Sequence, residues 1–190
     1  MGRLMKGDFI NNKYHGKGVL ALTNGTQFSG IFENGELLSP ATIEFTDGRV
    51  FFGEIQDYDI GRKGKLSYPN GESYEGTFES RLKEGEGIFL SQDGSKYEGR
   101  WVSDKKDGFG KEYNTILNEY YEGKFVNNKR EGKAKFINRR GEVFHSYWKN
   151  NKKHAKDKYI EKLEKKEYEQ LVKNFLKAKS NSQPNVRILV

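Results

Sequence analysis

The sequence predicts an all-β repeat array: an elongated, curved, single antiparallel β-meander sheet of two-stranded hairpins, followed by a C-terminal amphipathic α-helix. The first observation is a glycine that recurs every 23 residues from Gly7 to Gly99, because a fixed period indicates one small unit copied along the chain. The second is composition: only 34% of the 190 residues are hydrophobic, yet 14% are aromatic and 22 are glycine. This aromatic content is too high for ordinary disorder and predicts a core built from rings.

The third observation is the alternation of side chains around each glycine. In Tyr74-Glu75-Gly76-Thr77-Phe78 the two rings and the glycine share one face, and the period of two predicts a strand. Asn-Gly or Asp-Gly pairs stand at 24–25, 47–48, 70–71 and 93–94, and such pairs favour type I′ turns in tight hairpins. Each repeat is therefore expected to be a hairpin, in which the glycine leaves room for rings of the adjacent repeat to lie over the backbone.

The array is predicted to span residues 4–150, with six clear repeats and a degenerate seventh in which Ser146 replaces the glycine. Repeat two departs from the pattern at Ser39-Pro40-Ala41, and repeat five has an extra residue between 114 and 118. The extra residue predicts a bulge or a longer hairpin loop. The glycines expected to be structural are Gly7, Gly30, Gly53, Gly76, Gly99 and Gly123.

The chain after the array changes period. Apolar residues from Ile160 to Leu176 fall on one helical face, which predicts an amphipathic helix over 155–180 and an extended tail over 181–190. Three alternatives remain open for this helix. It caps the sheet or folds back over its aromatic face, it binds a partner helix or groove, or it lies on a membrane surface.

Charge and composition exclude several classes of function. Residues 151–190 carry a net charge of +6 out of +7 for the chain, so the array is nearly neutral and is not expected to bind nucleic acid. The chain has no cysteine, and its three histidines lack partners at metal-ligand spacing. No nucleophile–base pair or nucleotide loop is present, so no enzymatic activity, metal or cofactor is expected. No signal peptide or membrane-spanning run is recognised, which favours a cytoplasmic protein.

The pattern Tyr-Glu-Gly-x-aromatic, followed nine to eleven residues later by Gly-x-Gly, resembles the MORN repeat family over about residues 4 to 150. Copies four to six carry the resemblance most strongly. The resemblance implies an adaptor in cytoskeletal, ciliary or membrane-associated assemblies, in which some similar proteins bind a partner helix along the sheet. It also implies phospholipid binding as an alternative.

The leading hypothesis is a non-catalytic scaffold or adaptor, a subunit of a larger complex, that binds protein through the aromatic face of the sheet. Large rings are good anchors for a helix or an extended peptide in a groove. The groove candidates are Phe78, Tyr97, Trp101, Tyr121, Phe125 and Trp148. The alternative is a phospholipid-binding module whose basic segment attracts anionic headgroups. The lipid-binding candidates are Lys152, Lys153, Lys156 and Lys158.

Overall fold

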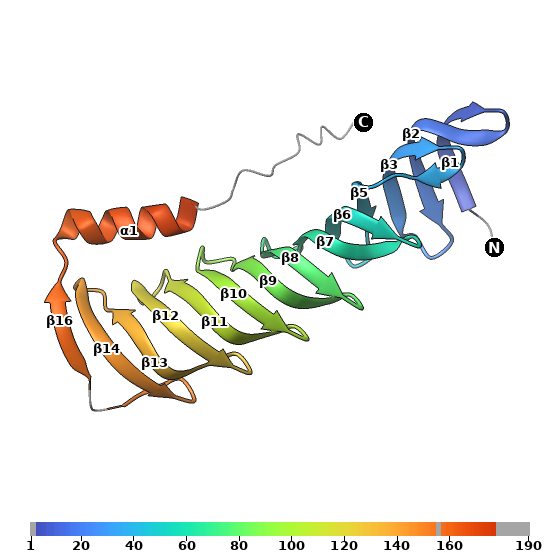
Figure 1. Cartoon of the computed structure of the whole chain (residues 1–190). Coiled ribbons are helices and arrows are strands. Elements are labelled where there is room, and N and C mark those ends of the chain that lie inside the picture. The colour runs from blue at the N-terminus through green and yellow to red at the C-terminus, as the bar shows by residue number, and fades with distance from the viewer. Residues whose placement is uncertain (1–2, 155–156, 178–190) are drawn as a thin grey trace.

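The computed structural model describes residues 3–154 and 157–177, which form one open, elongated and twisted sheet with a single helix (Figure 1). The strands are β1 (Arg3–Ile10), β2 (Lys13–Leu22), β3 (Gln27–Glu33), β4 (Glu36–Leu37), β5 (Ala41–Glu44), β6 (Val50–Gln56), β7 (Asp59–Ser67), β8 (Ser73–Glu79), β9 (Leu82–Leu90), β10 (Lys96–Val102), β11 (Lys105–Asn114), β12 (Glu119–Val126), β13 (Lys129–Ile137), β14 (Glu142–Lys149), β15 (Lys152–Lys153) and β16 (Lys158–Lys162). The helix is α1 (Lys165–Lys177).

The strands follow one another across the sheet in chain order, and every pair is antiparallel. Two hairpins have an interrupted second strand, because β4 and β5 both pair with β3 while β15 and β16 both pair with β14. The first interruption lies at Ser39-Pro40, where proline has no N–H for the ladder and the Ser39 hydroxyl instead accepts the Ile55 N–H at 2.9 Å. The predicted array of antiparallel hairpins in a single sheet is confirmed.

The predicted position of the type I′ turns is wrong. At Asn24-Gly25 and its three equivalents only the glycine has a positive φ, and the Asn24 side chain accepts the Thr26 N–H at 3.0 Å. This is a type I turn followed by a left-handed glycine. The turns with two positive φ angles lie in the alternate hairpins, at Asn11-Asn12, Asn34-Gly35, Asp57-Tyr58, Ser80-Arg81, Ser103-Asp104, Asn127-Asn128 and Asn150-Asn151.

These type I′ turns also connect one repeat to the next. The Asp104 N–H donates to the Lys83 carbonyl at 3.0 Å, and the Lys83 N–H donates back to the Asp104 carboxylate at 2.9 Å. The same reciprocal pair joins Asn128 to Lys106 and Asn151 to Arg130. The turn side chains therefore satisfy backbone groups that the strand ladder leaves open.

The glycines form a row across the sheet, in which Gly76 pairs with Gly64 and Gly87. A Cβ at Gly87 would overlap the ring of Tyr74, which lies over this row. Tyr74 belongs to the same repeat as Gly87, whereas the sequence predicted a ring from the adjacent repeat. A Cβ at any of the six predicted structural glycines would lie closer than 3.0 Å to another atom. The ladder glycines therefore leave room for packing, but the ring that uses this room belongs to the same repeat.

The C-terminal end of the sheet differs from the prediction. The array continues past residue 150 into β15 and β16, and the helix begins at Lys165, so the predicted helical start at 155 is wrong. Tyr159 pairs with Phe144, and their rings pack at 5.9 Å, which completes the seventh hairpin. The helix starts only where the Glu167 carboxylate accepts the Glu164 N–H at 2.9 Å as a capping interaction. The predicted helix end at 180 and the tail over 181–190 lie outside the described residues.

Candidate functional site

The six predicted groove rings are buried within the sheet, each no more than 6% exposed. They interlock in an edge-to-face series that runs along one face, with neighbouring ring centroids 5.0 to 5.5 Å apart. This series is called the aromatic ladder below, and its members are Tyr74, Phe78, Tyr97, Trp101, Tyr121, Phe125 and Trp148. Because the rings fill one another's edges, they form the core, and their prediction as an open groove is wrong.

The ladder tyrosines use their hydroxyls within the fold. Tyr74, Tyr97 and Tyr121 each donate to the carbonyl three residues ahead, at 2.9, 2.9 and 2.8 Å. Burial raises the pKa of all three phenols, that of Tyr121 to about 12. They are therefore neutral structural donors at physiological pH.

A row of cations covers the ladder in repeats four to seven. The row consists of Lys83, Lys106, Arg130 and Lys153, and each charge lies over ring faces at 4.3 to 5.8 Å. The equivalent positions in the first three repeats are the apolar Tyr14, Leu37 and Ile60. Cations placed in this way add cation–π attraction to the stacking of the rings.

Acidic side chains pair with cations of the row. Glu112 accepts from Lys106 Nζ at 2.6 Å and from Arg130 Nη2 at 2.7 Å. Burial alone would raise the pKa of Glu112, but the charges of Lys106 and Arg130 hold it below its ordinary value. Lys153 pairs with Asp157 at 2.6 Å. Lys106, Arg130 and Lys153 are therefore paired with carboxylates of the same chain.

The lysines predicted to bind lipid are not equivalent. Lys152 and Lys158 are exposed on β15 and β16, whereas Lys153 is held between Asp157 and the rings of Phe136 and Phe144. Lys156 lies outside the described residues. Of the three described lysines in this set, Lys152 and Lys158 therefore remain as lipid-binding candidates.

The helix folds back over the sheet (Figure 1), as one of the three alternatives predicts. It covers the face opposite the aromatic ladder, because it contacts Tyr113 and Tyr120, and Tyr120 alternates along β12 with the ladder residue Tyr121. Its apolar side packs on a second cluster, which is separate from the ladder. Sheet residues of this cluster are Tyr113, Tyr120, Ile137 and Val143, and its residues from the C-terminal segment are Leu163, Tyr168, Leu171, Val172 and Phe175.

Polar contacts fix the helix in place. The Tyr168 hydroxyl donates to the Asn118 carbonyl at 2.8 Å, and the Lys96 ammonium donates to the Phe175 carbonyl at 2.6 Å. Lys96 is 2% exposed and also pairs with Glu98 at 3.1 Å. A buried lysine at the last turn of α1 also suits the negative end of the helix dipole.

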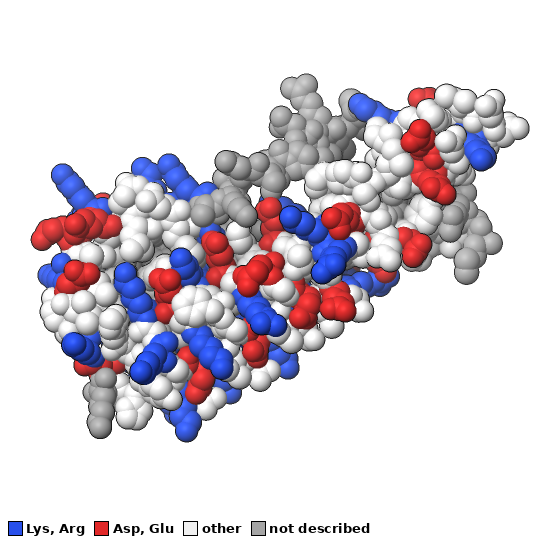
Figure 2. Space-filling model, in the orientation of Figure 1, with Lys and Arg blue, Asp and Glu red and all other residues white. Residues whose placement is uncertain are grey.

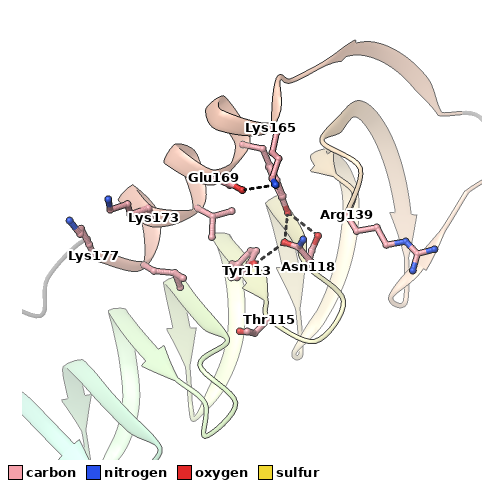
Figure 3. Close-up of a pocket in the computed structure, with 11 residues that line it drawn as sticks. Tyr113, Thr115, Asn118, Arg139, Lys165, Glu169, Lys173 and Lys177 are labelled. Atoms are coloured by element: carbon pink, nitrogen blue, oxygen red, sulfur yellow. Dashed lines mark hydrogen bonds and ion pairs between the residues drawn. The ribbon is translucent and has the colours of Figure 1, made fainter.

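A groove of about 930 Å³ lies between α1 and the loops that follow β11 and β13 (Figure 3). This binding groove is lined by Tyr113, Thr115, Asn118, Arg139, Lys165, Tyr168, Glu169, Val172, Lys173, Leu176 and Lys177. Its walls are mainly apolar, and Asn118 offers polar atoms at its base, where Tyr113 donates to the Asn118 side chain at 2.8 Å. The groove thus combines apolar lining with a few fixed polar groups, as ligand sites commonly do.

The rim of the binding groove is basic. It carries Arg139 on the β13–β14 loop and Lys165, Lys173 and Lys177 on α1, against one acid, Glu169, which lies 3.8 Å from Lys165. Figure 2 shows Lys and Arg side chains along the upper edge of the molecule, where α1 lies in Figure 1. The rim therefore favours an anionic ligand.

The loop between β11 and β12 supplies two further exposed apolar side chains beside the groove. Ile116 is 78% exposed and Leu117 is 53% exposed. This is the loop with the extra residue: Tyr113 pairs with Tyr120 across six intervening residues, whereas the equivalent Leu90 and Lys96 pair across five. The interpretation as a longer hairpin loop is therefore confirmed. Sequence reasoning identified the departure but did not associate it with a site, because the contact with α1 spans 50 residues of sequence.

Other kinds of site are not seen in the described part of the chain. No three His, Asp or Glu side chains in residues 3–154 and 157–177 group closely enough to hold a metal ion. Within the same residues, no helix has the length and apolar content needed to cross a membrane.

Fold and site together define a class: an open repeat sheet with an internal aromatic core and a separate groove under a C-terminal helix. Comparison with protein families identifies the repeat, because the MORN repeat model matches residues 6–27, 74–96, 97–115 and 121–142. These four segments of the chain are therefore MORN repeats. Residues 28–73 lie between the matches, and there the structure continues the same hairpins. Comparison with curated proteins gives no significant match.

Proposed function

We propose that the chain is a non-catalytic adaptor that holds a protein partner in the binding groove beside α1. The observation that carries the proposal is the position of the groove. It forms at the β11–β12 loop, which is longer than its repeat equivalents, and the helix packs against that loop through Asn118. Loops that depart from a rigid repeat scaffold are common positions for binding residues.

The groove supports a partner segment that is both apolar and acidic. Val172 and Leu176 of the helix and Tyr113 of the sheet offer apolar contacts, and the exposed Ile116 and Leu117 extend them. The cations of the rim can pair with carboxylates on either side of such a segment. An amphipathic helix or an extended peptide with flanking Asp or Glu residues has this chemistry.

The family resemblance supports the same class of function. MORN repeats occur in adaptors, and an elongated sheet with a docking groove at one end is suited to a subunit of a larger assembly. A cytoplasmic, cytoskeletal or ciliary assembly is part of this proposal and follows from the resemblance.

The experiment is peptide selection on the full chain, followed by fluorescence anisotropy of the enriched peptides. The peptides are expected to combine acidic and apolar residues. The variant Leu176→Asp and the double variant Lys173→Glu/Lys177→Glu should each weaken their binding by about 30-fold, the effect of losing roughly 2 kcal/mol at an interface hot spot.

The matched control is Arg62→Glu/Lys63→Glu, which reverses two exposed charges on β7, away from the groove. This variant should bind the selected peptides as tightly as the unmodified chain does. Enrichment of basic peptides, or binding that the groove variants leave unchanged, would overturn the proposal.

A phospholipid-binding role is the second candidate, supported by Lys152 and Lys158, which are exposed on the last hairpin. Sedimentation with vesicles containing phosphatidylserine tests it, with Lys152→Glu/Lys158→Glu as the variant. Binding at low salt that this variant abolishes would support a lipid surface as the ligand. No sedimentation with these vesicles at low salt would exclude it.

A further inference from the structure

The two ends of the sheet differ in how they are protected from pairing. At the C-terminal end, β15 and β16 are short, every residue of both is exposed, and they carry Lys152, Lys153, Lys158 and Lys162. Short, lysine-rich strands are a common protection of a sheet edge. At the other end, β1 has eight residues and pairs with β2 alone among the described residues.

The β1 strand exposes apolar side chains as well as backbone groups. Leu4 is 75% exposed, Phe9 is 56% exposed and Ile10 is 53% exposed. Alternation along the strand places Leu4, Lys6, Asp8 and Ile10 on one face, and Met5, Gly7 and Phe9 on the face of the aromatic ladder. A long, exposed edge of this kind is a template for another strand.

The sequence of β1 is complementary to itself in one antiparallel register. If two copies meet with Gly7 opposite Gly7, Lys6 lies opposite Asp8, Met5 opposite Phe9, and Leu4 opposite Ile10. Each of these pairs occurs twice about the twofold axis. Opposite charges and apolar pairs on directly facing residues stabilise antiparallel strands.

The neighbouring registers lack this complementarity. A shift that centres Lys6 places the two Lys6 ammonium groups opposite each other, and a shift that centres Asp8 does the same with two carboxylates. A shift by one residue would place the ladder face of one copy beside the outer face of the other. The Gly7 register also extends the glycine row, in which Gly7 pairs with Gly18 and Gly18 with Gly30.

We propose that β1 pairs with β1 of a second copy of this chain, antiparallel and centred on Gly7, so that two arrays form one continuous sheet. The twofold axis lies perpendicular to the sheet, which keeps the two ladder faces on the same side. The contact is isologous, as in most homodimers. Because one strand from each copy makes a small interface, the dissociation constant should lie in the micromolar range. The inference is independent of the binding groove.

The test is sedimentation velocity of the full chain at about 1 to 200 µM, which brackets a micromolar dissociation constant. The unmodified chain should shift from monomer to dimer. Lys6→Asp and Asp8→Lys each create two like-charge pairs and should raise the dissociation constant at least about tenfold. An equimolar mixture of these two variants should form a heterodimer, because each like-charge pair is then replaced by an opposite-charge pair.

The matched control is Lys17→Asp, a charge reversal at an exposed position on the neighbouring β2. It should leave the dimer unchanged, and circular dichroism of every variant should match that of the unmodified chain. A chain that stays monomeric over the whole range would overturn the inference. So would a dimer that neither single variant weakens, or a mixture of the two variants that forms no heterodimer.

Discussion

Trp101→Ala tests whether the aromatic ladder is core or binding surface. Trp101 is 4% exposed, its ring centroid lies 5.3 Å from those of Tyr74 and Tyr97, and its indole N–H donates to the Gly87 carbonyl at 3.2 Å. Replacement of a buried tryptophan by alanine typically costs 3–5 kcal/mol, so about 4 kcal/mol is expected here. In a chain of this size that loss lowers Tm by roughly 8 to 16 °C.

The assay is thermal and urea unfolding followed by circular dichroism, together with anisotropy of a peptide selected on the binding groove. The matched control is Phe109→Ala, whose ring is 62% exposed on the neighbouring β11; it should change the free energy of unfolding by less than about 0.5 kcal/mol. Peptide affinity should be unchanged in Trp101→Ala at temperatures where the chain is folded. A loss of stability below about 1 kcal/mol with weakened peptide binding would refute the reasoning, because it is the result of a surface anchor.

Four further substitutions test three separate parts of the structure. Glu112→Gln should lower the free energy of unfolding at pH 7, and its difference from the unmodified chain should vanish as the pH falls. The reason is that a carboxylate with a lowered pKa stabilises the fold above its ordinary pKa of about 4.3 and loses that contribution on protonation. Urea unfolding from pH 7 to pH 3 measures this difference. Ser80→Asn should raise the free energy of unfolding, and Asn127→Ser should lower it, each by a few tenths of a kcal/mol up to about 1 kcal/mol. The reason is that asparagine tolerates the positive φ of a type I′ turn better than serine does. Equal urea midpoints for the two variants and the unmodified chain would contradict this. Tyr168→Phe removes the hydroxyl that holds Asn118 and should weaken the docking of α1 by about 1 kcal/mol; hydrogen exchange of the helix amides measures it, and unchanged protection would argue against the contact.

The repeat made most of the fold predictable from sequence. A 23-residue period, alternation around each glycine and a change of period in the tail were sufficient for the antiparallel hairpins and the single helix. The turn assignment failed because Asn-Gly suits both a type I′ turn and a type I turn with a left-handed glycine. Pairs such as Ser80-Arg81 and Asp57-Tyr58 gave no local signal, since their positive φ angles depend on the surrounding ladder.

The predicted start of the helix failed for a related reason. Ile160 and Leu163 fit a helical face, yet residues 158–162 pair with β14, which needs a second strand to complete its hairpin. Tertiary pairing therefore overrides a local amphipathic pattern. Ser146 stands where the glycine is lost, and its hydroxyl accepts the Trp148 indole N–H at 3.0 Å in the last repeat.

The departures from the repeat, more than the repeat itself, provide both proposed binding surfaces. Residues that keep the period build a core in which the rings contact one another, and such residues are buried. The loop around Asn118, the basic rim beside α1 and the apolar edge of β1 all lie where the period is broken or begins. A partner that bound the periodic residues would have to displace packed rings. The irregular positions offer exposed apolar groups and charges that a partner can contact without disrupting the core. Changes that restore the repeat at these positions should therefore leave the sheet folded and remove peptide binding. Deletion of one residue from the β11–β12 loop is such a change.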